Sequence, residues 1–217
     1  MSKITERELK FFVPATKLRQ QVTFSKLKRL LLWQAYFSDD NTKEAFKLVF
    51  GNKTATPKLL TGRLRRSKIS KSYKYTATFK GPYLSECSRT EYEKKITAKL
   101  YKNLKPLCSG FEVHKARYLL PGSIIHRGKK YRITAEIDHL LKWTNEFFTV
   151  DLEVPKDAWI ASLRKGQHSF EFLKSGSIDL TTAPPEIRKV LSMKYLARNG
   201  FNQKARNAAA KLTSEVK

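Results

Sequence analysis

Residues 4–12, ITERELKFF, alternate between charged and apolar side chains with a period of two. Glu6, Glu8 and Lys10 occupy every second position, and Leu9 lies between two of them. Alternate residues of a β-strand face the same side of a sheet. The stretch therefore predicts a strand with one charged and one apolar face. A half-buried strand whose polar face meets water has the same pattern, so the interpretation depends on whether the pattern recurs.

Paired acidic residues recur along the chain with the same one-residue gap. In a strand the members of such a pair lie on one face, about 6.6 Å apart at ~3.3 Å per residue. Each pair therefore presents two carboxylates to one surface. The pairs are Glu6 and Glu8, Glu91 and Glu93, Glu136 and Asp138, and Asp151 and Glu153.

Basic residues follow the same spacing, and the positions between them are apolar. A surface sheet with one wet face explains one or two such strands. Recurrence over most of the chain favours a closed antiparallel sheet, whose charged faces line the interior and whose apolar faces pack outward under helices. The basic sets are Arg63 and Arg65, Lys74 and Lys80, Arg89 and Lys95, and Lys115 and Arg117.

Facing carboxylates inside a closed sheet need a cation between them. Without one they repel and raise each other's pKa. Hard divalent cations such as Mg²⁺ or Mn²⁺ prefer oxygen ligands and commonly bridge to phosphates. Arg and Lys side chains hold phosphate oxygens, Arg through a bidentate fork. The pattern thus predicts a basic tunnel with an acidic metal patch, suited to a short chain of phosphates.

Composition sets the class of protein. The chain has 217 residues with 41% hydrophobic content, which favours one globular domain over disorder. No apolar run approaches the ~20 residues of a membrane span, and the N-terminus lacks a signal-peptide core, so we expect a cytoplasmic protein with no membrane partner. Cys87 and Cys108 are too few for a disulfide framework, and the four His are scattered, which argues against a structural zinc site.

The net charge of +25 is the other unusual feature of the composition. It indicates a polyanionic partner, such as RNA, polyphosphate or a nucleotide, or else a solvated basic surface without a partner. The sequence leaves this choice, and the oligomeric state, open.

The opening Glu6-x-Glu8-x-Lys10 resembles the ExExK signature of the CYTH superfamily, the triphosphate tunnel metalloenzymes. The resemblance runs from about residue 3 to about residue 155, and its later motifs follow in the order of the family's strands. The stretch QAYF from Gln34 is similar to the QGYL of bacterial members, which favours the tripolyphosphatase-like branch. The later motifs are Arg63-x-Arg65, Thr78-x-Lys80, Arg89-x-Glu91-x-Glu93, Lys115-x-Arg117, Glu136-x-Asp138 and Asp151-x-Glu153.

The resemblance implies an α+β fold, an eight-stranded antiparallel barrel with a charged lumen and flanking helices. One domain would span residues 1–202, including a C-terminal helix, and residues 203–217 would form a polar tail. The implied cofactor is Mg²⁺ or Mn²⁺. The implied metal ligands are Glu6, Glu8 and Glu153, assisted by Asp138 and Asp151.

The resemblance also implies the phosphate ligands and the catalytic group. Glu91 and Glu93 would bind a second metal, orient water or pair with a neighbouring Arg, and they join Glu6, Glu8 and Lys10 as the catalytic residues. On the C-terminal helix, Lys189 or Lys194 would donate a base to substrate, or else would lie on a solvated helix face. The phosphate ligands would be Lys10, Arg63, Arg65, Lys80, Arg89, Lys115, Arg117 and Lys189.

The expected activity is metal-dependent hydrolysis of the terminal phosphoanhydride of tripolyphosphate or of a nucleoside or other organic triphosphate. A nucleotide (adenylate) cyclase of the same fold is the alternative enzyme. An RNA 5′-triphosphatase, or a protein that only binds RNA or polyphosphate, also agrees with the basic charge.

The segments outside these strands predict helices and loops. A helical face from Ala15 ends before Tyr36, and residues 38–57 read as a variable connection. Residues 97–107 predict a helix outside the sheet, and residues 181–200 a capped helix that ends at Gly200. Residues 203–217 read as a frayed helix or a tail.

Overall fold

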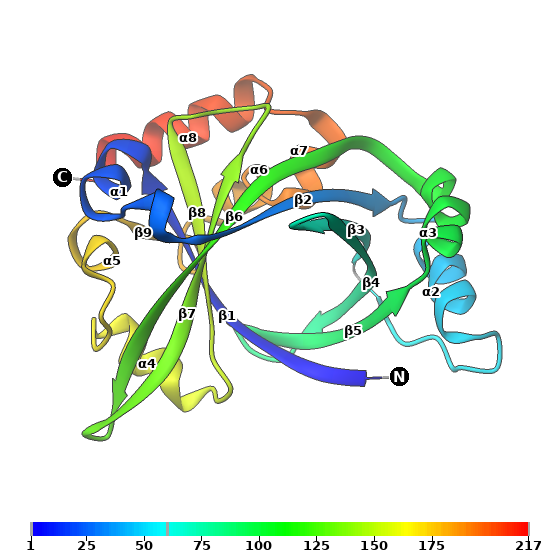
Figure 1. Cartoon of the computed structure of the whole chain (residues 1–217), viewed down its shortest axis with the longest axis horizontal. Coiled ribbons are helices and arrows are strands. Elements are labelled where there is room, and N and C mark those ends of the chain that lie inside the picture. Colours follow the sequence, from blue (N-terminus) through cyan, green and yellow to red (C-terminus); the bar gives the residue numbers. More distant parts are fainter. Residues whose placement is uncertain (1, 60, 217) are drawn as a thin grey trace.

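The computed structural model describes residues 2–59 and 61–216, and its centre is a closed antiparallel barrel (Figure 1). The sheet order is β5-β4-β3-β2-β6-β7-β8-β1, and β1 pairs back with β5. The predicted eight-stranded barrel with flanking helices is confirmed. Its strands are β1 (Ser2–Pro14), β2 (Lys28–Phe37), β3 (Thr61–Ile69), β4 (Ser72–Tyr83), β5 (Ser88–Ile96), β6 (Cys108–His126), β7 (Lys129–Leu140) and β8 (Phe147–Glu153).

Strand β1 closes the barrel by changing partners along its length. Its first half, to Arg7, pairs with β5, and its second half, from Glu8, pairs with β8. Where β5 has left it, the free side of β1 is taken by the short strand β9 (Ile178–Asp179). The two N-terminal glutamates of the ExExK motif therefore lie at the point where three strands meet.

Helices cover the apolar outer faces on two sides of the barrel. Helices α1 (Ala15–Gln21), α4 (Ala158–Arg164) and α5 (Glu171–Ser175) pack over β1, β7 and β8, where Leu9, Ile137 and Leu152 are fully buried. Helices α2 (Thr42–Phe50) and α3 (Ala98–Leu104) lie on the other side, over β3, β4 and β5 (Figure 1).

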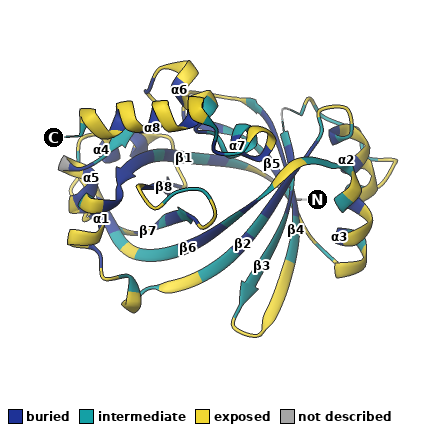
Figure 2. Cartoon of the chain, turned by 90° about the horizontal axis from the view of Figure 1, so that it is seen from above, coloured by how far each residue is buried: buried dark blue, intermediate teal, exposed yellow. Residues whose placement is uncertain are grey.

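A third core lies at one end of the barrel, where the inward-facing rows become apolar. Phe12 follows Lys10 on the inner face of β1, and Leu140 follows Asp138 on that of β7. Helices α6 (Pro185–Val190), α7 (Met193–Asn199) and α8 (Gln203–Glu215) pack on these residues. Figure 2 shows the three helices together, with their outer sides exposed and their inner sides buried. They cover this end of the interior.

Two predictions for the segments between strands are wrong. The helix predicted from Ala15 ends at Gln21, and Lys28–Phe37 is strand β2, because pairing with β3 and β6 overrides a helix-like apolar spacing. Residues 38–57 are not simply a connection, since they contain helix α2 with buried Phe46 and Val49.

The remaining segments agree in part with the predictions. The helix at 97–107 is confirmed as α3 followed by a 3-10 turn. The helix expected at 181–200 is two helices, because Ser192 caps the start of α7 by accepting a hydrogen bond from the Tyr195 backbone N–H. It does end at Gly200. Residues 203–215 form α8, whose buried Leu212 packs into the third core.

None of the helices in the described part of the chain is long and apolar enough to cross a membrane. Cys87 and Cys108 are both free thiols.

Candidate functional site

The barrel encloses a cavity of about 240 Å³, lined by charged side chains from β1, β3, β4, β5, β6, β7 and β8. This volume far exceeds the ~10–15 Å³ that one water molecule requires. Leu180, Arg188 and Met193, from the C-terminal segment, line it as well. The predicted site residues that line the cavity are Glu6, Glu8, Lys10, Arg63, Arg65, Lys80, Arg89, Lys115, Arg117, Asp151 and Glu153.

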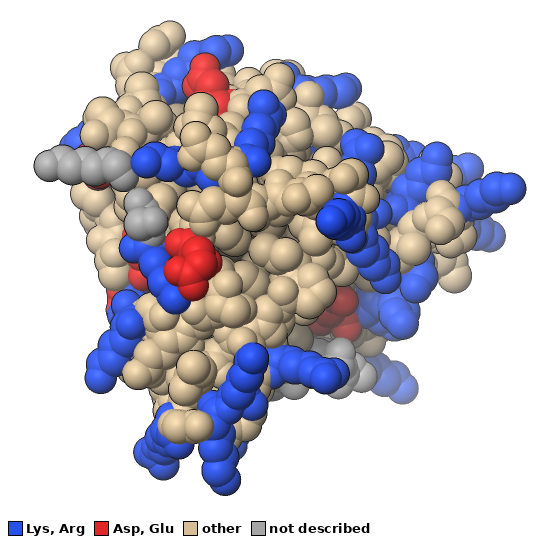
Figure 3. All heavy atoms as spheres, turned by 60° about the vertical axis from the view of Figure 1, so that its left-hand side comes forward, with Lys and Arg blue, Asp and Glu red and all other residues tan. Residues whose placement is uncertain are grey.

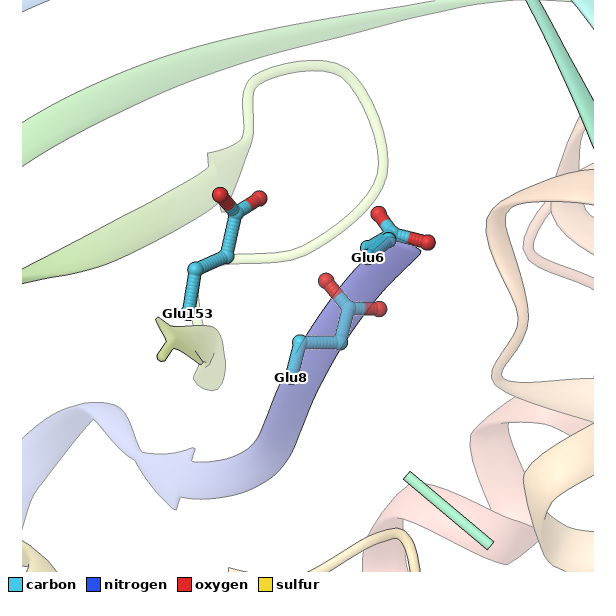
Figure 4. A group of neighbouring side chains, drawn as sticks. All are labelled: Glu6, Glu8 and Glu153. Carbon is cyan, nitrogen blue, oxygen red and sulfur yellow. The ribbon is translucent and has the colours of Figure 1, made fainter. Parts of the chain in front are cut away.

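Glu6, Glu8 and Glu153 form a carboxylate cluster at one wall of the cavity. One oxygen from each lies within 4.8 Å of the other two. Figure 4 shows Glu6 and Glu8 on β1 and Glu153 at the end of β8 directed toward a common space. Three carboxylates at this spacing match the oxygen ligands that Mg²⁺ and Mn²⁺ prefer. The three residues predicted as the principal metal ligands are therefore together.

The three carboxyl groups of the cluster differ in protonation. Burial, Glu136 and Glu8 raise the pKa of Glu153 to about 7. Burial also opposes ionisation of Glu6, but Lys80 and Arg89 outweigh it and hold the pKa of Glu6 far below its usual range. Burial opposes ionisation of Glu8 in the same way, and Lys10 lowers its pKa. Two carboxylates are thus ionised, and the third keeps its proton up to neutral pH.

Basic side chains anchor the cluster from one side. The Lys80 Nζ atom donates to Glu6 Oε1 at 2.5 Å, and Arg89 Nε donates to Glu6 Oε2 at 2.7 Å. Glu8 is held less tightly, with Arg89 at 3.6 Å and Lys10 at 3.9 Å. Glu8 and Glu153 are therefore the members of the cluster whose oxygens are most available to a cation.

A second ionic network lies deeper between β6, β7 and β8. Arg117 donates through Nε and Nη2 to both carboxylate oxygens of Asp138, each at 2.7 Å, and it also contacts Glu136. Lys115 pairs with Asp138. Burial and Arg117 lower the pKa of Lys115 to about 7. This network neutralises Asp138 with protein cations.

Asp138 and Asp151, predicted to assist the metal, lie outside the carboxylate cluster. Asp138 is bound by Arg117 and Lys115 and is not among the described residues that line the cavity. Asp151 lines the cavity, but its carboxylate pairs with Lys10. To bind the metal, either carboxylate would first have to release the Lys or Arg side chain with which it pairs.

Arg63 and Arg65 project from β3 into the cavity as half-buried cations. The Nε atom of Arg63 is buried and has no hydrogen-bond partner among the described residues. Burial and the neighbouring Arg63 and Arg117 lower the pKa of Arg65 to about 10. A buried N–H donor without an acceptor is costly in the free protein, even though Glu91 and Glu6 favour the charged form of Arg63. An anion in the cavity would supply the missing acceptor.

Three further predicted residues do not reach the cavity. Glu91 is buried against Lys80 at 3.2 Å, and Glu93 accepts a hydrogen bond from Thr78 at 3.0 Å. Both carboxylates therefore hold the lining residues Lys80 and Thr78 from the neighbouring strand β5. Lys189 lies on the exposed side of α6 and is absent from the described lining.

Two basic residues of the C-terminal helices do line the cavity. Arg188, which the sequence interpretation missed, donates to the Thr181 carbonyl at 2.9 Å. Lys194, named as one of two alternatives, donates to Asp39 at 2.9 Å. Glu136 also lines the cavity. Glu136 lies two residues before Asp138 and therefore on the same inward face of β7, and this spacing was the signal in the sequence for its position.

Comparisons with known proteins gave structural matches of low identity. No protein-family model matches the sequence, and no curated protein matches it. The inorganic triphosphatase NE1496 is 21% identical, with 89% of this chain and 95% of that chain covered and a TM-score of 0.41. The putative adenylate cyclase bh2851 from Bacillus halodurans is 13% identical, with coverage of 88% and 100% and a TM-score of 0.46. The PH1819 protein from Pyrococcus horikoshii OT3 is 18% identical, with coverage of 74% and 85% and a TM-score of 0.46. These TM-scores are below 0.5, so the functional assignment rests on the cavity itself.

Proposed function

We propose that this protein is a divalent-metal-dependent triphosphatase that hydrolyses the terminal phosphoanhydride of a triphosphate held inside the barrel. The supporting observation is that one cavity inside the barrel combines the carboxylate cluster with inward-facing cations, among them half-buried Arg63, whose Nε has no partner among the described residues. A phosphate chain bound beside a divalent cation would place the metal ion on the carboxylate cluster and phosphate oxygens on the basic side chains.

The protein's part in the reaction is to bind, neutralise and align. Phosphoryl transfer needs charge neutralisation and in-line positioning more than a covalent partner. Arg63, Arg65 and Lys80, on two neighbouring strands, would hold phosphate oxygens, the arginines through their planar forks. Because these cations are fixed in the barrel wall before substrate arrives, they stabilise developing charge without reorganising.

The metal fits the donor set of the carboxylate cluster. Glu8 and Glu153 would be its principal ligands, with Glu6 holding Lys80 and Arg89 in place while contributing charge. Bound Mg²⁺ or Mn²⁺ would supply Lewis-acid neutralisation of phosphate oxygens.

The test is a phosphate-release screen with Mg²⁺ and with Mn²⁺. The substrates are tripolyphosphate, thiamine triphosphate, the nucleoside triphosphates, 5′-triphosphorylated RNA and long polyphosphate. We expect orthophosphate from at least one triphosphate, and loss of that release in Glu8→Gln. Glu186→Gln, on the exposed side of α6, removes the same charge outside the cavity and is the control.

Product analysis with ATP separates hydrolysis from cyclisation. Orthophosphate as the product supports the proposal. Pyrophosphate together with a cyclic nucleotide would replace it with the cyclase alternative. Binding of RNA or polyphosphate without any phosphate release would show that the cavity is only a binding site.

A further inference from the structure

The acidic residues are unevenly distributed, and the strands on one side of the barrel lie in segments that lack them. Between Glu44 and Glu86 the chain has ten Lys and Arg and no Asp or Glu. The segments between Glu8 and Asp39, and between Glu112 and Glu136, also have none. These segments contain β2, β3 and β4 and most of β6. The positive charge is therefore not confined to the cavity, and on the face shown in Figure 3 Lys and Arg are more prominent than Asp and Glu.

Strands β2, β3 and β4 carry aromatic and basic residues in register on their outer faces. Leu31 on β2 pairs with Lys68 on β3, and Lys68 pairs with Tyr73 on β4. Two residues further along β2, Trp33 pairs with Arg66. These residues alternate with the inward-facing Arg63, Arg65 and Gln34, so they point away from the cavity. We call Leu31, Trp33, Arg66, Lys68 and Tyr73 the outer patch. Its side chains are spaced at ~4.8 Å across strands and ~6.6 Å along them.

The centre of the outer patch is a guanidinium between two rings. The Arg66 Cζ atom lies 4.5 Å from the Trp33 ring centroid and 5.5 Å from that of Tyr73. The Arg66 Nε atom is buried and has no hydrogen-bond partner among the described residues. Tyr73 is 46% exposed, and Trp33 and Lys68 are half-buried. The patch thus presents partly exposed aromatic rings to solvent beside two half-buried cations.

One carboxylate acts on the patch only at a distance. Glu112, on β6, interacts electrostatically with Arg66, but its oxygens accept hydrogen bonds from Lys105 at 2.5 Å and contact His114 at 3.0 Å. A solvated basic surface would need only the lysines, and a hydrophobic contact would need only the rings. A partner with both flat π-systems and regularly spaced negative charges uses every member of the patch.

We propose that the outer patch binds single-stranded nucleic acid, with bases stacked on Tyr73 and Trp33 and phosphates on Arg66 and Lys68. The surface lies outside the barrel, so this binding does not depend on the hydrolytic activity. Binding at the outer patch gives a function to part of the basic charge that lies outside the cavity. Duplexes are a poor fit, because their bases are not available to flat rings on an open sheet.

Tryptophan fluorescence and affinity measurements with a fluorescein-labelled single-stranded 12-mer test the proposal. We expect the unlabelled 12-mer to quench Trp33 emission, and Trp33→Phe to remove the quenching, whereas Trp143→Phe keeps it. Tyr73→Ala should weaken binding at least about fivefold, the loss of one stacked base. Lys68→Ala should reduce the slope of log K against log salt concentration by about 0.7, the loss of one phosphate contact.

Matched controls distinguish a built surface from general polyanion attraction. Phe111→Ala removes another exposed aromatic ring, and Lys99→Ala another exposed lysine. Circular dichroism of every variant establishes that the fold is kept. Equal affinities for Tyr73→Ala and Phe111→Ala, unchanged quenching in Trp33→Phe, or equally tight binding of a duplex would each overturn the proposal. If polyphosphate displaces the 12-mer completely and Tyr73→Ala weakens the binding of neither ligand, the patch is not the binding site.

Discussion

Glu8 of β1 and Glu153 of β8 are directly opposite one another in the barrel wall, and both contribute oxygens to the carboxylate cluster. Like charges in directly paired strand positions destabilise a sheet. Once Glu153 is ionised, above its pKa of about 7, the pairing is therefore unfavourable in the metal-free chain and becomes favourable when a cation lies between the two carboxylates. Stability and metal binding are opposed at this pair.

Glu153→Gln should separate the two effects. At about pH 8, above the pKa of Glu153, removing one of the facing charges should stabilise the metal-free protein by ~0.2–1 kcal/mol. Wild-type protein should gain about 2.7 kcal/mol from metal at 100 times the dissociation constant, and the variant much less at that concentration. Thermal unfolding with and without Mn²⁺ measures both quantities. A variant that unfolds at a lower temperature without metal, yet gains as much from Mn²⁺, would contradict the role assigned to Glu153.

The pH dependence of metal binding should follow Glu153. Its pKa is raised from 4.5 to about 7, first by burial and then by Glu136 and Glu8. Between these values the folded chain holds a proton that the unfolded chain has released. This group's contribution to the unfolding free energy of metal-free protein therefore falls as pH rises from about 4.5 to about 7, and stays level above.

A metal ion must displace that proton in order to bind. Affinity for Mn²⁺ should therefore fall about tenfold for each pH unit below 7 and level off above it. Calorimetry in buffers of different ionisation enthalpy should record about one proton released at pH 6. An affinity that is constant from pH 5.5 to 8 would contradict this reading of the cluster.

Arg63→Ala should affect ligand binding much more than stability. The free protein loses a half-buried cation that Glu91 and Glu6 favour but whose Nε has no partner among the described residues, so its unfolding temperature should change little. Affinity for tripolyphosphate should fall by roughly 10- to 150-fold, the loss of a charge-assisted hydrogen bond of ~1.5–3 kcal/mol. Arg63→Lys keeps the positive charge but lacks the planar guanidinium fork, so its affinity for tripolyphosphate should lie between those of the wild-type protein and Arg63→Ala. Unchanged tripolyphosphate affinity in Arg63→Ala would remove Arg63 from the phosphate site.

Gly110 should be required for the packing of α7 over the end of the barrel. It has φ +75°, and a Cβ there would lie 2.3 Å from the Ala197 carbonyl oxygen on α7. Gly128 has φ +74° with no atom within 4 Å of such a Cβ. Gly128→Ala should therefore cost only the ~1–2 kcal/mol of the backbone conformation. Gly110→Ala should cost a further ~1–3 kcal/mol from overpacking. Denaturant unfolding measures the difference, and equal losses would contradict the close contact.

The sequence predicted the barrel because its interior is charged. Along β1 and β7 the inward-facing side chains are ionic and the outward-facing ones apolar, so the period of two can be recognised in the sequence. Strand β2 has no such contrast. Leu31 and Leu32 point to opposite faces and Tyr36 belongs to the end core, so its run of apolar residues resembled a helix.

The same limit explains which site residues could be foreseen. Glu6, Glu8 and Glu153 come together because strand register fixes neighbours, and register follows from alternation. Which basic residue of α6 enters the cavity, Arg188 and not Lys189, depends on how the helix docks on Phe12 and Leu140. That rotation about the helix axis is set by packing over a long sequence separation, and spacing within the helix does not encode it.

The central claim is that a cation on the carboxylate cluster contacts the phosphates of the bound triphosphate. Electron–nuclear double resonance on the Mn²⁺-loaded protein measures this contact directly through the coupling between Mn²⁺ and phosphorus-31. We expect a phosphorus coupling when tripolyphosphate is added to wild-type protein, and neither bound Mn²⁺ nor coupling in Glu8→Gln. Mn²⁺ that binds as well in Glu8→Gln, or tripolyphosphate that binds without any phosphorus coupling, would contradict the account.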